Sequence, residues 1–223
     1  MRRGRGGMSA PAPTPTAASP ITSGLLLAIF EQYRLPPFGL HGVSHWARVL
    51  ENGRRLVPLT GARSDVVELF AVLHDACRRN EHCDPRHGLR GAELAARLRG
   101  SAFDLDDAGL RLLTQACGGH TDGRRDGDVT VLTCWDADRL DLARAGIRPH
   151  AGKLCTQAAC DPELMAWATA RSEALEMPQR VAAEWGIDAR FSLAWGGRGP
   201  VNGETARRGS AAARRGRHPR RPR

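Results

Sequence analysis

The stretch "DVVELFAVLHDACRR", residues 65–79, carries apolar side chains at helical spacing and then places a histidine beside an aspartate. Val67, Ala71 and His74 share one stripe of the expected helix, because residues three, four and seven apart lie on the same helix face. The pattern predicts a helix over residues 64–79. Its buried face ends in two polar groups, His74 and Asp75, where packing alone would favour apolar side chains.

Working outward, the chain between residues 21 and 196 is helical in pattern almost throughout. Apolar–polar alternation never lasts long enough to build a sheet. We therefore predict an all-α fold, a helical bundle in one domain without internal repeats. The predicted helices cover residues 23–33, 41–57, 64–79, 85–100, 106–117, 129–147, 162–175 and 178–187.

The two ends of the chain differ from this body. Residues 1–20 are rich in Gly, Pro, Ala and Thr, and residues 197–223 are rich in Gly and Arg. Neither segment has apolar periodicity, so we expect both to be disordered tails. Eleven of the 33 Lys and Arg residues lie at 2–5 and 207–223, so the other 22 are outnumbered by 24 Asp and Glu. The body is mildly acidic although the whole chain carries +9.

The basic C-terminal tail suggests contact with nucleic acid, but it has no aromatic residue for stacking on bases. We expect weak, sequence-independent binding at most, and we expect residues 20–200 to retain metal and activity. The apolar run "GLLLAIF" at 24–30 is too short to span a bilayer. The six Cys form no CxxC pair, and no signal-peptide pattern opens the chain. These features predict a cytoplasmic protein without membrane contact.

Histidines and carboxylates converge on the expected helices. His41 and His45 are four residues apart, on one face of a helix start. Together with His74 and Asp75, His45 offers nitrogen and oxygen donors, which suit Mn, Fe, Co, Ni or Zn better than Ca. Taken alone, the pair His74–Asp75 also fits a solvated helix end. The other donors shift the interpretation towards a divalent metal.

A last carboxylate comes from "WDADRLDL", residues 135–142. Asp138 shares its helix face with Val131 and Cys134 and is expected to point to the core, whereas Asp136 is rotated by about 200°. A buried carboxylate is costly without a partner, and either a metal or an arginine would neutralise it. We prefer Asp138 as a ligand and keep Asp136 as the fallback.

The order His45, His74–Asp75 and Asp138, with "ADRL" around the last, resembles the H…HD…D signature of HD-domain metal-dependent phosphohydrolases. The resemblance covers about residues 38–145. It implies an all-α fold with a metal where several helices meet, and His45, His74, Asp75 and Asp138 as ligands. It also implies hydrolysis of a nucleotide or another small phosphate or pyrophosphate ester.

Two further histidines, His87 and His120, stand where binuclear relatives of this superfamily place additional ligands. A second metal is therefore an open alternative, as is a helix-capping or phosphate-binding role for these residues. Asp75 is the candidate for positioning the attacking water, and His120 and Arg48 are the candidates for neutralising substrate charge. Arg78, Arg79 and Arg90 also lie near these ligands in sequence and could clamp phosphate oxygens. Each of these arginines, like Arg48, also fits a solvated surface. Arg139 is expected to pair with a carboxylate. His82 and Cys83 match no strong zinc pattern.

Two other functions remain as alternatives to the hydrolase. A di-metal oxygenase of the same superfamily would be favoured if His87 and His120 complete a second iron site. A non-catalytic module that senses a nucleotide would be marked by a missing ligand, and all four are present in the sequence. The sequence does not determine the oligomeric state.

Overall fold

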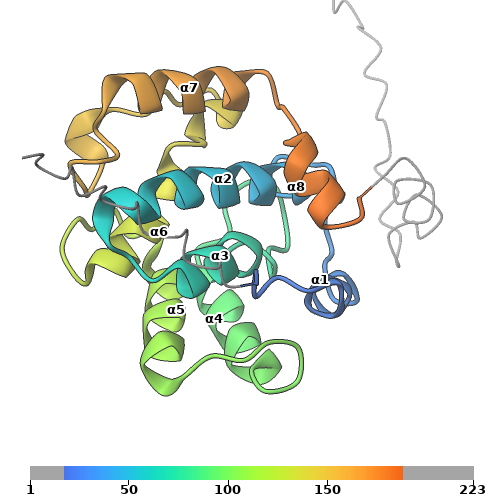
Figure 1. Ribbon diagram of the computed structural model, residues 1–223. Helices are drawn as coiled ribbons and strands as arrows, with labels where there is room; N and C mark the ends of the chain where they lie inside the picture. Colours follow the sequence, from blue (N-terminus) through green and yellow to red (C-terminus); the bar gives the residue numbers. More distant parts are fainter. Residues whose placement is uncertain (1–17, 188–223) are drawn as a thin grey trace, which may run out of the picture.

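The central helix of the molecule is α2 (Val43–Thr60), which carries buried residues along most of its length. In the computed structural model, which describes residues 18–187, α2 packs against α3 (Ser64–Leu73) and α6 (Val129–Arg139). Gly61 ends α2 in the left-handed conformation with φ of 76°, where a glycine avoids the steric cost of a Cβ. Figure 1 shows α2 running across the middle of the molecule.

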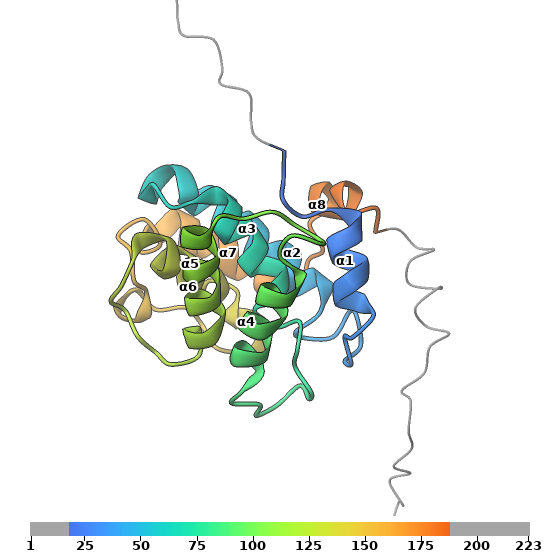
Figure 2. The ribbon, with the colours of Figure 1, turned by 90° about the horizontal axis from the view of Figure 1, so that it is seen from below.

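A second layer is formed by the hairpin of α4 (His87–Leu98) and α5 (Asp107–Gly119). Asp106 caps α5 by accepting a hydrogen bond from the Gly109 amide. Because α5 also contacts α3 and α6, the hairpin is held against the ends of the central helices. The two helices lie side by side in Figures 1 and 2.

The remaining helices lie around this core. They are α1 (Ser23–Phe30), α7 (Pro162–Glu173), α8 (Gln179–Glu184) and the short 3₁₀ turns η1 (Leu142–Ala145) and η2 (Ala151–Lys153). Thr22 caps α1 through a hydrogen bond from the Leu25 amide. Helix α7 packs on η1 and α2, on the opposite side of α2 from the α4–α5 hairpin (Figure 1).

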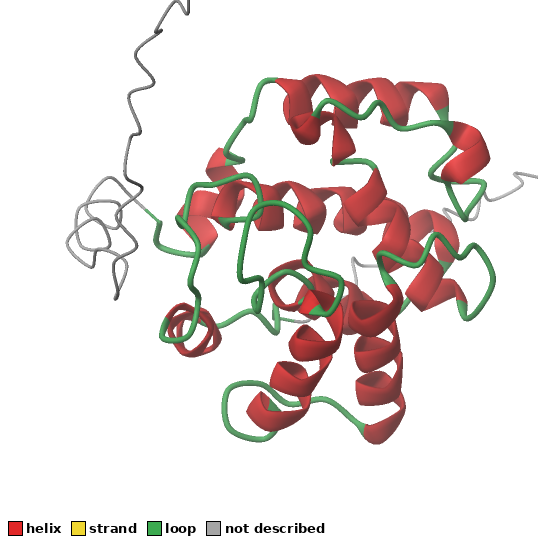
Figure 3. Ribbon diagram, turned by 180° about the vertical axis from the view of Figure 1, so that it is seen from behind, coloured by secondary structure: helices red, strands yellow, loops and turns green. Residues whose placement is uncertain are grey.

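The all-α prediction is confirmed: residues 18–187 contain helices and loops but no strand (Figure 3). No helix in this part of the chain combines the length and apolar character needed to cross a membrane. All six cysteines are free. The expectations for residues 1–17 and 188–223, including the basic tail, lie outside the described residues. Ser19, placed in the N-terminal tail by the sequence, donates a hydrogen bond to Glu68.

The largest differences from the predicted helices lie at the C-terminal ends of two of them. The helix expected over 64–79 stops at Leu73, and the helix expected over 129–147 stops at Arg139. After Leu73 the chain tightens into i+3 turns, since Ala76 donates to the Leu73 carbonyl and Arg78 to the Asp75 carbonyl. The buried side-chain contacts of the polar residues at these points override the local helical preference. The helix expected from His41 likewise begins two residues later, at Val43.

Candidate metal centre

Two imidazoles from neighbouring helices meet in the interior. His45 lies in the first turn of α2, and His74 is the residue that follows α3. Both side chains are fully buried, and their Nε2 atoms are 3.1 Å apart. The packing of α2 on α3 therefore brings residues 29 positions apart in sequence to one point.

Two carboxylates complete this group. Asp138 Oδ1 lies 3.5 Å from His45 Nε2 and 3.7 Å from His74 Nε2. Asp75 Oδ2 lies 3.6 Å and 3.7 Å from the same two nitrogens. Ligands bonded tetrahedrally at about 2.1 Å stand about 3.4 Å from one another. His45, His74 and Asp138 can hold a metal ion together. We call these three residues and Asp75 Oδ2 the first subsite.

A second group lies on the other side of Asp75. Its Oδ1 atom is 3.0 Å from His87 Nε2 and 3.7 Å from His120 Nε2, and these two nitrogens are 2.9 Å apart. His74, Asp75 and His120 also form a group able to hold an ion. We call His87, His120 and Asp75 Oδ1 the second subsite. Asp75 thus directs one oxygen towards each pair of histidines.

Close packing of α4 brings His87 into place. A Cβ atom on Gly91 would stand 2.5 Å from the Leu73 carbonyl oxygen, and one on Gly88 would stand 2.3 Å from the Cys117 carbonyl oxygen. Because these positions lack a side chain, the first turns of α4 can touch the ends of both α3 and α5. The His87 ring consequently stacks edge-on against His120, with ring centroids 4.7 Å apart.

The Nδ1 atoms of the four histidines all face oxygen acceptors. His45 Nδ1 is 2.7 Å from Asp141 Oδ2 and His74 Nδ1 is 3.1 Å from the Phe70 carbonyl oxygen. His87 and His120 meet main-chain carbonyl oxygens at 2.5 and 2.8 Å, respectively. A carbonyl or carboxylate oxygen only accepts, so each Nδ1 carries the proton. Each neutral ring therefore presents the Nε2 lone pair, which is the form that binds metals.

The environment keeps the first subsite ready for a cation. Burial lowers the pKa of His74 to about 3, and burial together with Arg144 lowers the pKa of His45. Burial acts to raise the pKa of Asp138, but His74, His45 and Arg144 outweigh it and the pKa is lowered. Neutral imidazoles and an ionised carboxylate thus coexist at neutral pH.

Asp75, which lies between the subsites, and His120 of the second subsite have pKa values that are shifted in opposite directions. Burial acts to raise the pKa of Asp75, but the surrounding histidines hold it well below its usual value. Burial acts to lower the pKa of His120, yet its interaction with the Asp75 carboxylate and the charge of Asp138 raise it. In the absence of an ion, His120 therefore takes up a proton at a higher pH than His45 and His74 do.

Asp138 and Asp136 have separate surroundings, as the helical rotation between them predicts. Asp138 lies at the first subsite, whereas Asp136 accepts hydrogen bonds from the Cys155 amide at 2.7 Å and from the amide and hydroxyl of Thr156 at 2.8 Å. Asp136 therefore anchors the loop at 155–156. It does not approach the histidine pair.

Arg48, the candidate for neutralising substrate charge, has its partners within the protein. Its guanidinium is buried, donates to Asp141 at 2.6 and 3.0 Å and donates to the Glu176 carbonyl oxygen at 2.8 Å. With these contacts it braces Asp141 behind His45. Arg139 is also unlike the expectation, since it donates to the carbonyl oxygens of Lys153 and Arg124 and to Cys155 Sγ.

Three further residues lie at the centre: His41 and Asp141 were not assigned a role from the sequence, whereas Arg78 was a candidate for clamping phosphate oxygens. His41 Nδ1 bonds Asp75 Oδ2 at 2.8 Å, and Asp141 orients His45. Arg78 Nη1 lies 3.4 Å from Asp75 Oδ1 and 3.1 Å from His87 Nε2. The spacing of His41 four residues before His45, and of Asp141 three after Asp138, was the available signal.

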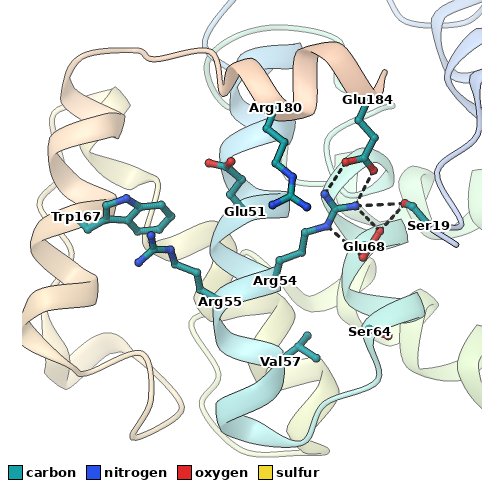
Figure 4. A pocket seen from close by; sticks show the side chains of 10 residues that line it. All are labelled: Ser19, Glu51, Arg54, Arg55, Val57, Ser64, Glu68, Trp167, Arg180 and Glu184. Atoms are coloured by element: carbon teal, nitrogen blue, oxygen red, sulfur yellow. Dashed lines mark hydrogen bonds and ion pairs between the residues drawn. The ribbon is translucent and has the colours of Figure 1, made fainter. Parts of the chain in front are cut away.

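A cavity of the described residues lies away from these groups. It measures about 620 Å³ and opens on the face of α2 directed towards α7 and α8 (Figure 4). Arg54 spans it, pairing with Glu68 at 2.9 Å and with Glu184 at 2.7 Å, and Arg55 stacks on Trp167 at 3.7 Å. None of the six predicted metal ligands lines this cavity. A search for a functional site by cavity volume alone would therefore not lead to the histidine and aspartate groups.

Comparison with known proteins yields no match to a family model, to a curated protein or to a solved structure. The resemblance to HD-domain phosphohydrolases therefore stays a prediction. What the structure shows is that buried His and Asp groups able to hold a metal ion lie where five helix ends meet.

Proposed function

We propose that the protein is a metal-dependent phosphohydrolase of the HD-domain type. Its substrate would be a nucleotide or another small phosphate or pyrophosphate ester. The observation that carries the proposal is the position of Asp75, whose two oxygens face the pair His45–His74 and the pair His87–His120. Four imidazoles whose Nε2 atoms face one carboxylate form, once all are neutral, a donor set for divalent transition metals. The order of these residues supports the same family.

The residues of the chain supply binding and orientation for the reaction. When bound there, a divalent cation would supply positive charge that acidifies water and polarises a phosphoryl oxygen. Hydrolysis requires water to attack phosphorus, the ester P–O bond to break, and the leaving oxygen to gain a proton. Asp75, ionised and buried, is the carboxylate placed to orient the water. Arg78, beside Asp75 and His87, replaces Arg48 as the proposed cation for the phosphate oxygens.

The test combines metal analysis with a panel of nucleotides and generic phosphate esters. Asp75→Ala should lose both bound metal and phosphatase activity while keeping its helix content by circular dichroism. The matched control is Asp122→Ala, at an exposed position of the loop after α5. Hydrolysis by Asp75→Ala at the parent rate would show that the reaction does not depend on this site.

The second subsite also favours one other function, a di-metal oxygenase. Two histidine pairs joined by a carboxylate can hold two iron ions as well as the metals of a hydrolase. Two bound irons with a visible charge-transfer absorption, and no turnover of any phosphate ester, would select the oxygenase. Metal without iron, together with phosphate release, would select the hydrolase.

A further inference from the structure

A small pocket of about 190 Å³ adjoins the turn that follows α3. Three segments form it: the residues after α1, the turn at 77–79 and the outer face of α4. Its lining residues are Gln32, Arg34, Cys77, Arg78, Arg79, Arg90, Glu93 and Arg97. Five guanidinium groups thus surround one small space with a single carboxylate.

Most of this positive charge is not neutralised by the protein. Arg78 is paired with Asp75 at 3.4 Å and Arg90 with Asp84 at 2.5 Å. Within residues 18–187, the guanidinium groups of the other three, Arg34, Arg79 and Arg97, form none of the observed hydrogen bonds or ion pairs. Like charges held together in this way repel one another, and an anion between them would remove the repulsion.

The pocket is continuous with the metal centre through Arg78 and α4. Arg78 is 7% exposed, lines the pocket and lies 3.1 Å from His87 Nε2. Arg90 and Arg97 lie three and ten residues after His87. The three side chains therefore fall within about 80° of one another around α4. One helix face therefore carries a ligand of the second subsite at its start and two arginines of the pocket further along.

We propose that this pocket binds a phosphate-type oxyanion. The forked donors of arginine match phosphate oxygens, and a buried arginine at the base gives the site a fixed donor. The volume decides the size of the ligand, because pockets for drug-sized molecules measure about 300–1,000 Å³. A phosphate or diphosphate group fits in 190 Å³, whereas a nucleoside does not. The proposal does not depend on hydrolysis at the metal centre.

The binding test is calorimetric titration of the full-length protein with methylenediphosphonate, a diphosphate analogue that resists hydrolysis. We expect the double variant Arg34→Gln/Arg97→Gln to bind at least tenfold more weakly than the parent, since each change removes a charged donor. Both arginines are exposed, so the variant should keep its fold, which thermal unfolding checks.

Two controls assign the binding to the pocket. Arg111→Gln removes an exposed arginine from α5 and should leave the affinity unchanged. Asp138→Asn alters the first subsite and should retain diphosphonate binding. The proposal is overturned if the parent does not bind the probe, if the double variant binds like the parent, or if Asp138→Asn alone abolishes binding.

The bound oxyanion has two possible sources, a second phosphoryl group of a substrate or a free phosphate ion. For the first source, the double variant should raise the KM for adenosine 3′,5′-bisphosphate by a larger factor than the KM for adenosine 5′-monophosphate. For the second, it should instead change the inhibition or activation by added inorganic phosphate. If no nucleotide or phosphate ester of the panel is hydrolysed, the proposed function fails, while the calorimetric result still decides the pocket.

Discussion

At the scale of single residues, the centre depends on pairs of groups that satisfy each other in the interior. A buried carboxylate or imidazole without a partner costs several kcal/mol. Here every Nδ1 has an oxygen acceptor, and Asp75 is bonded by His41 while also facing the other four histidine side chains. The exceptions are the Nε2 lone pairs, which all point at Asp75 or Asp138. These groups could hold a metal ion, and a bound cation would be a partner for the lone pairs.

The first residue-scale prediction separates the two neighbouring aspartates. Asp138→Asn should lower metal affinity in the first subsite, because an amide oxygen is a weaker ligand than a carboxylate. Asp136→Asn should keep the metal and destabilise the fold by about 1–3 kcal/mol, because its oxygens accept main-chain amides. Metal content and chemical denaturation measure both effects. Loss of metal only in Asp136→Asn would contradict the assignment.

The second concerns Asp141, a positioning residue behind His45. Asp141→Asn should lower metal affinity by about 10–100-fold, as outer partners of ligating histidines do. It should also destabilise the fold by about 3–5 kcal/mol, because Arg48 loses its buried counter-charge. Metal titration and thermal unfolding provide the readouts, with exposed Asp122→Asn as the control.

The charge of Asp141 also determines the direction in which the loss of stability in Asp141→Asn changes with pH. Burial acts to raise its pKa, but His45 and Arg48 lower it to about 2, below the ordinary value of 3.8. Its stabilising contribution is therefore fully present above pH 3.8 and is lost as the pH falls through 2. The stability gap between parent and Asp141→Asn should narrow over that window. A gap that widens there would contradict the ion-pair explanation.

At the scale of elements, the second subsite depends on how closely α4 approaches the ends of α3 and α5. Gly88 and Gly91 allow main chain to touch main chain, and His87 lies in the same turn. A helix docked through side chains would stand further away and would carry His87 away from His120. The subsite is thus a consequence of helix packing as much as of ligand identity.

The element-scale prediction concerns the effect of adding a single methyl group to α4. Gly91→Ala should displace α4, destabilise the fold by about 1–3 kcal/mol and lower the metal content by one ion per chain, leaving the first subsite filled. Gly118→Ala is the matched control, because a Cβ there meets only Leu89 at an ordinary 3.5 Å. Thermal unfolding and metal stoichiometry measure the outcome. An unchanged stoichiometry in Gly91→Ala would show that the second subsite does not require this packing.

At the scale of the whole molecule, the centre joins helices from both layers. The first subsite uses α2, the end of α3 and α6, and the second uses α4 and the end of α5. Ions held there would bind the folded chain and not the unfolded one, so they would stabilise the fold by mass action. Asp75 couples the two layers because it contacts both subsites.

The whole-molecule prediction is release of metal in two steps on acidification. His74, with a pKa of about 3, and His45, with a lowered pKa, stay unprotonated at pH 5, whereas the raised pKa of His120 lets protons compete near neutral pH. Falling pH should therefore empty the second subsite before the first. Metal content after dialysis at pH 7.5, 6 and 5 measures this. Simultaneous loss of both ions, or earlier loss from the first subsite, would refute it.

The sequence by itself determined the all-α class and indicated which residues to propose as metal donors. Helical periodicity is local, so it could show that Asp138 and Asp136 point in different directions, and that Ser64 and Asp106 lie at helix starts. It could also indicate that His45, His74 and Asp75 belong to one set, from their order and residue types. These inferences require only contacts within a few residues along the chain.

The tertiary structure alone decided where α3 and α6 end, which partner each charge finds, and how the histidines divide into two pairs. Arg48 reaches Asp141 across 93 positions in sequence, and His87 reaches His120 across 33. No periodicity within a single segment of the sequence predicts either contact. A buried charge takes whichever partner the packed helices bring near, and that choice depends on contacts such as Gly91 on Leu73 that no single segment encodes.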